Sequence, residues 1–189
     1  MHAGLWAVVM ALFIMSFIIQ AFKIPSGSME DTLLIGDHLF VNKFIYGLRM
    51  PYNKEKRVLT FKKPKRRDIV VFEYPLDTSK DYIKRCIGLP GETIEIKDKQ
   101  VYINGEKLDE PYVYHNDPNT YPNGPYLPTN LKKRDNFGPV IIPRGEYFMM
   151  GDNRDFSSDS RVWGPLPHKY IKGEALVVYW PPSRMGLIK

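Results

Sequence analysis

The sequence predicts a mainly β protein that begins with an apolar segment long enough to cross a membrane. Sixteen prolines, fourteen glycines and twelve tyrosines among 189 residues favour short strands and many turns. No stretch beyond the N-terminal segment repeats its apolar residues with a long helical period. Hydrophobic residues make up 43% and charged residues 25%, as in an ordinary globular protein with one or two modest domains.

The apolar segment, AGLWAVVMALFIMSFIIQAF, runs from Ala3 to Phe22 without a charged residue. As a helix it would reach about the 30 Å of a bilayer's hydrocarbon core. A cleaved signal peptide is the alternative. However, no basic segment precedes the run, it exceeds the usual ~7–15 apolar residues, and no clear small-x-small site follows it. We therefore predict a retained anchor over residues 1–22.

Alternation and turn residues predict strands in the first half of the chain. HLFVNKFIYG (38–47) alternates loosely and ends at a glycine. MPYNKEKRVLTFKKPKRRD (50–68) is polar, and five of the six residues in KKPKRR are basic. It is interpreted as a solvated hairpin or loop, with contact to lipid headgroups or nucleic acid as the alternative. DIVVFEYP (68–75) predicts a buried strand closed by its proline.

The second half continues the β pattern around a loop-rich stretch. DYIKRCIGLPGETIEI (81–96) contains two strand-like runs split by the turn GLPGE, and Asn104-Gly105 predicts a two-residue hairpin. Residues 108–140 are rich in Pro, Asn and Tyr, which indicates long loops of a peripheral insertion. Regular patterning then resumes as a strand, an acidic and serine-rich loop and a last strand at 145–150, 151–164 and 174–180.

Several kinds of chemistry lack a motif in this sequence. The net charge of +6 suits nucleic acid and anionic lipid equally, and the single Cys86 excludes an intramolecular disulfide. There is no HExxH, GxSxG or CxxC pattern, although a triad using His38 or His168 stays open because triads assemble in space. DNRDFSSDS resembles a calcium loop only faintly, since Arg154 stands where an oxygen ligand should be. We predict no metal and no cofactor.

The remaining chemistry is a serine activated by a lysine, beginning in the segment IPSGSMED (24–31). Gly27 allows a tight bend and close approach of a substrate carbonyl, which makes Ser28 the candidate nucleophile. The hydroxyl of Ser26 is a second donor beside the Ser28 backbone N–H, so the two serines form a candidate oxyanion hole.

Lys84 is the candidate base. A lysine accepts a proton only when neutral, so its ordinary pKa of about 10.4 must fall by about two or three pH units, which burial can achieve. Lys84 lies in the strand-like DYIKRCI, with Tyr82 and Cys86 on its face by alternation. The alternative is a lysine whose ammonium group is exposed at a sheet edge.

At this point the residues resemble a known family. IPSGSMEDTLLIGD, RRDIVVFEYP, DYIKRCIGLPGE and GDNRDFSSDSRVWGPLP look, in order, like the motif boxes of bacterial type I signal peptidases (leader peptidases). These are membrane-anchored serine endopeptidases that remove signal peptides from exported preproteins. The resemblance covers almost the whole chain. It implies preprotein signal peptides and membrane lipid as partners, and no nucleic acid, cofactor or metal.

The resemblance also implies a role for individual residues. Ser28 is the nucleophile, Lys84 the general base and later the general acid, and Ser26 the side-chain donor of the oxyanion hole. In the last box, Ser157 holds the lysine ammonium, while Asp159 and Arg161 brace the loop to which Asp152 belongs. A small pocket for the substrate residue before the cleaved bond is lined by Ile24, Pro25, Met29, Leu33, Tyr82 and Ile83.

The fold implied by the resemblance is a catalytic core of coiled antiparallel sheets with a smaller β insertion. The core comprises residues 23–92 and 144–189, the insertion residues 93–143, and one transmembrane helix within residues 1–22 precedes them. The substrate is expected to add an extended strand beside Asp81–Lys84. The family topology places the N-terminus inside and the body on the extracytoplasmic side of the bacterial inner membrane, whereas a literal count of basic residues gives the reverse.

The sequence departs from the family pattern at Asp31, where proline is common, and little chain precedes the apolar run.

Two other hypotheses stay open. One is a self-cleaving Ser-Lys repressor, or another protease on a related β scaffold. It would need a DNA-binding module, whereas the N-terminus of this chain has an apolar run. The other is a membrane-tethered β domain that binds lipid or nucleic acid through KKPKRR.

Overall fold

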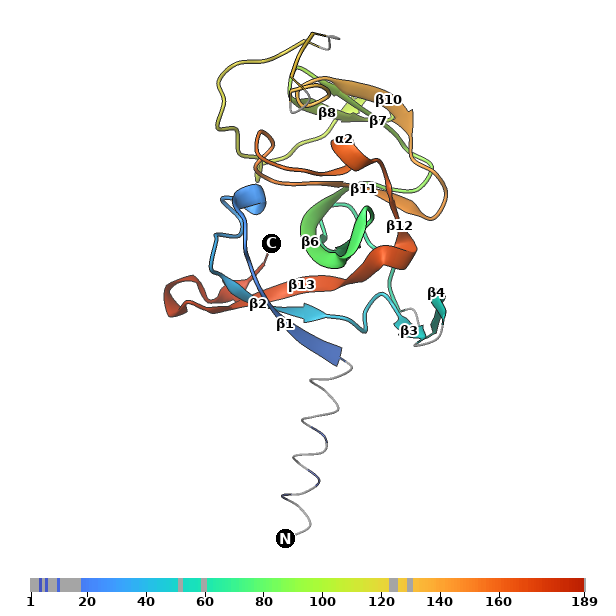
Figure 1. Ribbon diagram of the computed structural model, residues 1–189, viewed down its shortest axis with the longest axis vertical. Helices are drawn as coiled ribbons and strands as arrows, with labels where there is room; N and C mark the ends of the chain where they lie inside the picture. Colours follow the sequence, from blue (N-terminus) through green and yellow to red (C-terminus); the bar gives the residue numbers. More distant parts are fainter. Residues whose placement is uncertain are drawn as a thin grey trace.

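The computed structural model describes residues 18–50, 53–58, 61–122, 126–128 and 131–188, together with Gly4, Trp6 and Met10. This part of the chain is mainly β, with three antiparallel sheets and a few short helical turns (Figure 1). The strands are β1 (Ile19–Lys23), β2 (His38–Asn42), β3 (Leu48–Met50), β4 (Asn53–Val58), β5 (Ile69–Tyr74), β6 (Asp77–Gly88), β7 (Thr93–Lys97), β8 (Gln100–Ile103), β9 (Glu106–Lys107), β10 (Phe137–Ile141), β11 (Glu146–Met150), β12 (Leu166–Pro167), β13 (Ile171–Trp180) and β14 (Gly186–Leu187). The helical turns are η2 (Gly27–Met29), α2 (Ser160–Trp163), η3 (His168–Tyr170) and η4 (Pro182–Arg184).

The largest sheet has the strand order β1-β2-β13-β5-β6-β11-β12, with β14 also paired to β13. Its central strand β5 is buried on both faces, as its unbroken apolar sequence predicts. Ile69 and Val71 pack into one hydrophobic cluster, and Val70 and Phe72 pack into another on the opposite face. The sheet is therefore a two-sided core, and β6 lies beside its most buried strand.

The strand β6 links the two parts of the core. It pairs with β5 through register pairs that include Lys84 with Val70, and with β11 through Arg85 with Met150. Figure 1 shows β6 as a strongly curled ribbon next to β11. Because successive side chains of a strand point to opposite faces, Lys84 and Arg85 enter different environments.

A second sheet has the order β10-β7-β8-β9. Its Ile94 and Val101 pack in one hydrophobic cluster with Ile87 of β6 and with Phe148 and Met150 of β11. The hairpin predicted at Asn104-Gly105 is confirmed. Both residues have positive φ, 52° and 86°, as a type I′ turn requires, and β8 pairs with β9 across them. Within the stretch predicted as loops, residues 108–122 contain no strand, whereas β10 occupies its last part.

The other predicted strands are found with shifted ends. Those at 38–47, 68–75, 145–150 and 174–180 correspond to β2, β5, β11 and β13. The first of them ends earlier than predicted because the side chain of Asn42 accepts the backbone N–H groups of Phe44 and Ile45, at 2.9 and 3.1 Å, and so starts a turn.

Most of the predicted membrane anchor lies outside the described residues. Its last part is described, and residues 19–22 belong to β1, which pairs with β2. For these four residues the prediction of a helix is wrong, because their backbone groups bond to a neighbouring strand. In the described part of the chain, no helix is both long and apolar enough to span a bilayer.

The basic segment KKPKRR is largely engaged within the protein. Lys62 lies 2.9 Å from a Glu174 carboxylate oxygen, Arg66 pairs with Glu92, and Arg67 donates to the backbone carbonyl of Asp109. These contacts favour the interpretation as a hairpin or loop over that of a nucleic-acid site.

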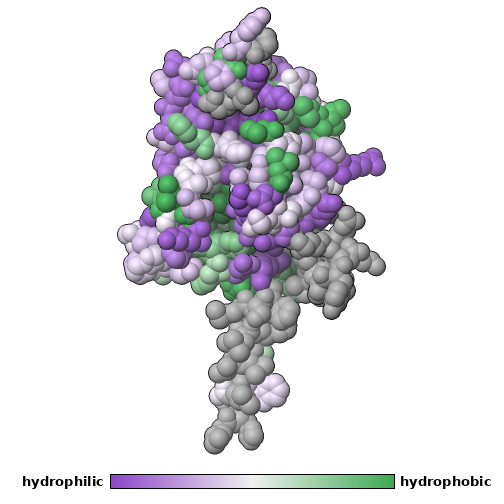
Figure 2. Space-filling model, viewed as in Figure 1, coloured by the Kyte–Doolittle hydropathy of each residue, from purple (hydrophilic) through white to green (hydrophobic). Residues whose placement is uncertain are grey.

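On the face seen in Figure 2, hydrophilic side chains predominate and apolar side chains form separate patches.

Candidate active site

Ser28 lies in a tight turn that a neighbouring loop holds from the side. The turn is η2, and only 8% of Ser28 is exposed. The backbone N–H of Asn153 donates to the Ser28 carbonyl at 3.2 Å, and the Asn153 side-chain amide donates to the Gly27 carbonyl at 3.1 Å. Gly151 packs so closely that a Cβ there would collide with the Ser28 carbonyl oxygen. The position of Ser28 therefore depends on the loop that follows β11.

Lys84 reaches Ser28 from β6. Its Nζ atom lies 2.6 Å from the Ser28 Oγ atom, although the two residues are 56 positions apart in the chain. The amine also donates to the Ile83 carbonyl at 3.0 Å, and the residue is only 4% exposed. The strand therefore delivers a nearly dry amine to the hydroxyl of Ser28.

Burial lowers the pKa of Lys84 from 10.5 to about 8. Asp159 and Asp152 oppose this change because their carboxylates favour a charged amine, while Arg161 supports it. Each of these carboxylates is itself paired with an arginine, which weakens its effect on the amine. Near neutral pH a fraction of Lys84 is therefore uncharged, and in that form its nitrogen can accept the proton of the Ser28 hydroxyl.

Ser26 lies beside the same pair of atoms. Its Oγ atom is 3.5 Å from the Ser28 Oγ atom, and the side chain is exposed to the cleft. An O–H donor at this place can reach an oxygen that develops charge next to Ser28.

Asp159 and Arg161 hold the loop that follows β11. The guanidinium donates to both carboxylate oxygens of Asp159, at 2.9 and 2.8 Å, and to the carbonyls of Arg154 and Arg134. Asp159 also accepts the Gly151 N–H at 3.1 Å. Burial alone would raise the pKa of Asp159, but Arg161 and neighbouring donors outweigh it and hold this pKa below its ordinary value. The pair therefore joins three segments of backbone beneath the turn of Ser28.

Ser157 lies in the same loop, but the structure does not bring it into a hydrogen bond with Lys84. Its Oγ atom is buried and makes no hydrogen bond of ordinary geometry with the described residues. The hydroxyl is near enough to Asp159 to help lower the pKa of that carboxyl, and a Cβ at Gly151 would collide with it. Ser157 therefore lies between Asp159 and Gly151, and its hydroxyl oxygen keeps free acceptor positions.

Asp152 is paired with Arg85, a residue that the sequence did not single out. The guanidinium donates to both carboxylate oxygens, at 2.8 and 2.6 Å, and both side chains are almost fully buried. Thr32 donates to the same carboxylate at 2.6 Å. The pair thus connects β6, the loop after β11 and the segment after η2, on the face of β6 opposite to Lys84.

Replacing Arg85 with methionine is expected to reduce the free energy of unfolding by about 3–5 kcal/mol, because it leaves the buried charge of Asp152 without its partner. Chemical denaturation at neutral pH measures this change. Lys80→Met, which breaks an exposed pair with Asp77, is the matched control and should cost far less, because solvent screens this pair. Equal losses in the two variants would contradict this account of the buried pair.

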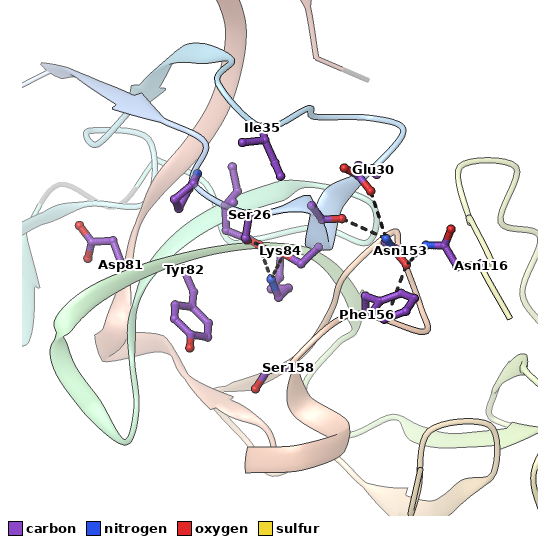
Figure 3. Close-up of a pocket in the computed structure, with 14 residues that line it drawn as sticks. Ser26, Glu30, Ile35, Asp81, Tyr82, Lys84, Asn116, Asn153, Phe156 and Ser158 are labelled. Atoms are coloured by element: carbon purple, nitrogen blue, oxygen red, sulfur yellow. Dashed lines mark hydrogen bonds between the residues drawn. The ribbon is translucent and has the colours of Figure 1, made fainter. Parts of the chain in front are cut away.

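Ser26, Ser28 and Lys84 border a cleft of about 550 Å³ (Figure 3). Its lining consists of Pro25, Ser26, Gly27, Ser28, Glu30, Ile35, Asp81, Tyr82, Ile83, Lys84, Asn116, Asn153, Phe156 and Ser158. Of the predicted pocket residues, Pro25, Tyr82 and Ile83 line the cleft. The other three, Ile24, Met29 and Leu33, lie in the hydrophobic cluster against which Ile83 packs. Within the described ranges, no group of three His, Cys, Asp or Glu side chains is arranged to hold a metal.

Sequence reasoning missed several residues at this cleft. Glu30, Asn116 and Phe156 line it, and Asn153 holds the turn of Ser28. Asn153 could have been predicted from the sequence, since it stands next to Asp152 in the motif GDNRDFSSDS. Asn116 carried no local signal, because it comes from the loop-rich stretch. It meets the site through the parallel bridge between Tyr114 and Asn153 and through its own hydrogen bond to Asn153.

Comparisons with known proteins agree on one family. The family described as "Signal peptidase, peptidase S26" matches residues 1–180. A signal peptidase I of Pseudomonas fluorescens is 39% identical over 94% of this chain and 74% of its own length, and signal peptidase I V of Bacillus subtilis is 37% identical over 90% and 92%. A crystal structure of a signal peptidase I from Enterococcus faecalis is 36% identical, covering 60% of this chain and 97% of that chain with a TM-score of 0.45.

Proposed function

The chain belongs to the signal peptidase family of S26 peptidases and is a serine endopeptidase, and we propose that it removes N-terminal signal peptides from exported preproteins. Cleavage follows small-x-small sites and uses Ser28 as nucleophile and neutral Lys84 as general base. The observation that carries this proposal is the 2.6 Å contact between a buried amine and the hydroxyl of a serine in an open cleft.

The chemistry proceeds in two stages. In the first, Lys84 accepts the Ser28 proton while the Oγ atom bonds to the carbonyl carbon of the scissile peptide. The Ser28 N–H and the Ser26 hydroxyl stabilise the oxyanion that forms. The carbon–nitrogen bond then breaks, the Lys84 ammonium gives its proton to the leaving amine, and an ester to Ser28 remains. In the second stage Lys84 takes a proton from water, whose oxygen bonds to the ester carbon. The bond from that carbon to the Ser28 Oγ atom then breaks, the Lys84 ammonium returns its proton to Oγ, and the signal peptide leaves with a new C-terminal carboxyl group.

The supporting residues act by holding these groups in place. Asp159 and Arg161 brace the loop that packs on the turn of Ser28, and Asp152 ties this loop to β6 through Arg85. Ser157 orients the Lys84 ammonium once substrate is bound, by accepting one of its N–H groups with the hydroxyl oxygen that has no hydrogen-bond partner among the described residues.

The pocket for the residue before the cleaved bond is shallow and apolar. Pro25, Tyr82 and Ile83 form its wall. Ile24, Met29 and Leu33 lie behind it in the cluster against which Ile83 packs, and since they are at most 2% exposed, the pocket takes only a small side chain. The substrate chain lies extended beside Asp81–Lys84, so main-chain bonds set its register.

The proposed organisation follows the three parts expected from the sequence. Residues 1–22 contain a single membrane anchor, 23–92 with 144–189 form the catalytic core, and 93–143 form an inserted β subdomain. The separate sheet of β7–β10 supports the insertion, which packs on the core through a shared hydrophobic cluster. The enzyme is placed in the bacterial inner membrane with its body on the extracytoplasmic side, where substrate cleavage sites emerge.

Incubation of the full chain in detergent with a preprotein tests this function. The expected products are the mature protein and the intact signal peptide, identified by mass and by sequencing of the new N-terminus. A matched preprotein with tryptophan in place of the small residue before the cut is the control, and it should stay uncleaved. Absence of cleavage, or cleavage elsewhere in the preprotein, would contradict the proposal.

The cleavage rate is expected to rise with pH and to level off above about 8. Burial lowers the pKa of Lys84 to about 8, so below that pH the neutral, proton-accepting form decreases about tenfold per pH unit. A pH–rate profile of kcat/KM with a fixed peptide measures this, alongside circular dichroism to check that the fold persists. A profile that is flat between about pH 6 and 10 is incompatible with Lys84 as the base.

A further inference from the structure

The cleft extends past the reacting pair in two directions. Figure 3 shows Asp81 and Tyr82 on one side of Lys84, and Glu30, Asn116, Asn153 and Phe156 on the other. If the proposed function holds, the substrate reaches Ser28 along the side of Asp81 and Tyr82. The chain that follows the cleaved bond then leaves through the opposite side, which so far has no assigned role.

Glu30 is the charged side chain on this opposite side. Its carboxylate lies against Gly27, where a Cβ would meet it at 2.6 Å, so the charge sits beside the turn that carries Ser28. Its side-chain hydrogen bond is a long one from the Asn153 amide, at 3.4 Å. In the part of the chain that the structure describes, Glu30 has no salt-bridge partner. The carboxylate therefore keeps free acceptor positions and an uncompensated charge.

The other acidic residue of the cleft is compensated. Asp81 lies 2.7 Å from the Lys172 ammonium, which reduces its effect on a bound peptide. The two ends of the cleft thus differ, since Glu30 alone presents an open negative charge to the substrate. Beside Glu30, the Asn116 amide donates to Asn153 at 3.3 Å, and the Phe156 ring is 68% exposed. An amide and an exposed ring suit the backbone and the side chains of an extended peptide.

We propose that Glu30, with Asn116 and Phe156, forms the subsite for the first residues after the cleaved bond, and that Glu30 sets its charge preference. A basic side chain there is attracted to the carboxylate, and an acidic one is repelled by it. An exposed pair of charges changes a binding or rate constant by about two- to fivefold. Attraction and repulsion both contribute, so kcat/KM for a basic substrate should exceed that for an acidic one by about tenfold at low ionic strength. The difference should be smaller in high salt.

Three peptides that share a small-x-small site test this preference. They differ only in the two residues after the cleaved bond, which are both lysine, both glutamine or both aspartate. For wild type, kcat/KM should decrease in the order lysine, glutamine, aspartate. In Glu30→Gln, the ratio between the lysine and aspartate peptides should fall at least about fivefold. A general structural defect would lower all three rates together and leave the ratio unchanged.

The matched control is Asp31→Asn. Asp31 is the next residue, is exposed and does not line the cleft, so its removal makes the same change in net charge without altering the subsite. An equal fall of the ratio in both variants, or a wild-type ratio near one, would overturn the role of Glu30. These outcomes leave the glutamine peptide cleaved and the proposed function intact. Failure of wild type to cleave any of the peptides would overturn the proposed function, and the subsite with it.

Discussion

Ser28→Ala is expected to lower preprotein cleavage by about 10⁴-fold or more while leaving the fold intact. The substitution removes the oxygen that bonds to the substrate carbonyl. Ser26 cannot replace it, because the amine of Lys84 bonds to the Ser28 oxygen, whereas Ser26 lies 3.5 Å from that oxygen. The fold should persist because the turn is held through backbone carbonyls by Asn153, and these contacts do not involve the Ser28 hydroxyl. Product formation measured by mass, together with thermal unfolding, checks both parts.

Two other serines serve as comparisons for this variant. Ser26→Ala removes one oxyanion donor and should lower kcat by about 10²–10³-fold, leaving measurable cleavage. Ser79→Ala changes an exposed serine at the start of β6 and should have no effect. Substantial cleavage by Ser28→Ala would exclude Ser28 as the nucleophile and would mean that another hydroxyl in the cleft attacks the substrate.

Local patterns predicted most of the β structure because turn residues and alternation act over short distances. Asn104-Gly105 marks a hairpin that both residues adopt with positive φ, and the apolar run at 68–75 is the buried β5. The single turn of α2 was not predicted. It depends on Asp159 as the N-cap, and this side chain is held both by Arg161 within the turn and by the backbone N–H of Gly151 outside it.

The site was only partly predictable for the same reason. Motifs pointed to Ser28 and Lys84, and the structure places their reacting atoms 2.6 Å apart. The ion-pair partner of Asp152 could not be predicted from the sequence, because the pairing of β6 with β11 is what brings Arg85 next to it. Glu30 was not predicted either. Its proposed effect on substrate charge depends on the cleft that it lines and on its lack of a salt bridge among the described residues.

Lys84→Met is expected to abolish cleavage and, at neutral pH, to make the protein more stable. Methionine fills a similar space but cannot accept a proton, so activity should fall by about as much as in Ser28→Ala. The gain in stability follows from burial. A pKa lowered from 10.5 to about 8 means that the charged amine costs the folded state about 3 kcal/mol relative to water. Methionine removes this cost.

The pH dependence of that gain identifies its cause. Between pH about 8 and 10.5 folded wild type has lost the Lys84 proton while the unfolded chain still holds it, so wild-type stability rises with pH in this window. The advantage of Lys84→Met over wild type should therefore be largest below pH 8 and vanish near pH 10.5. Lys97→Met, at an exposed lysine, should show no such change. A gain that is independent of pH would instead mean that methionine merely packs better. The lowered pKa of the amine would then have no support, and the general base would have to be sought elsewhere.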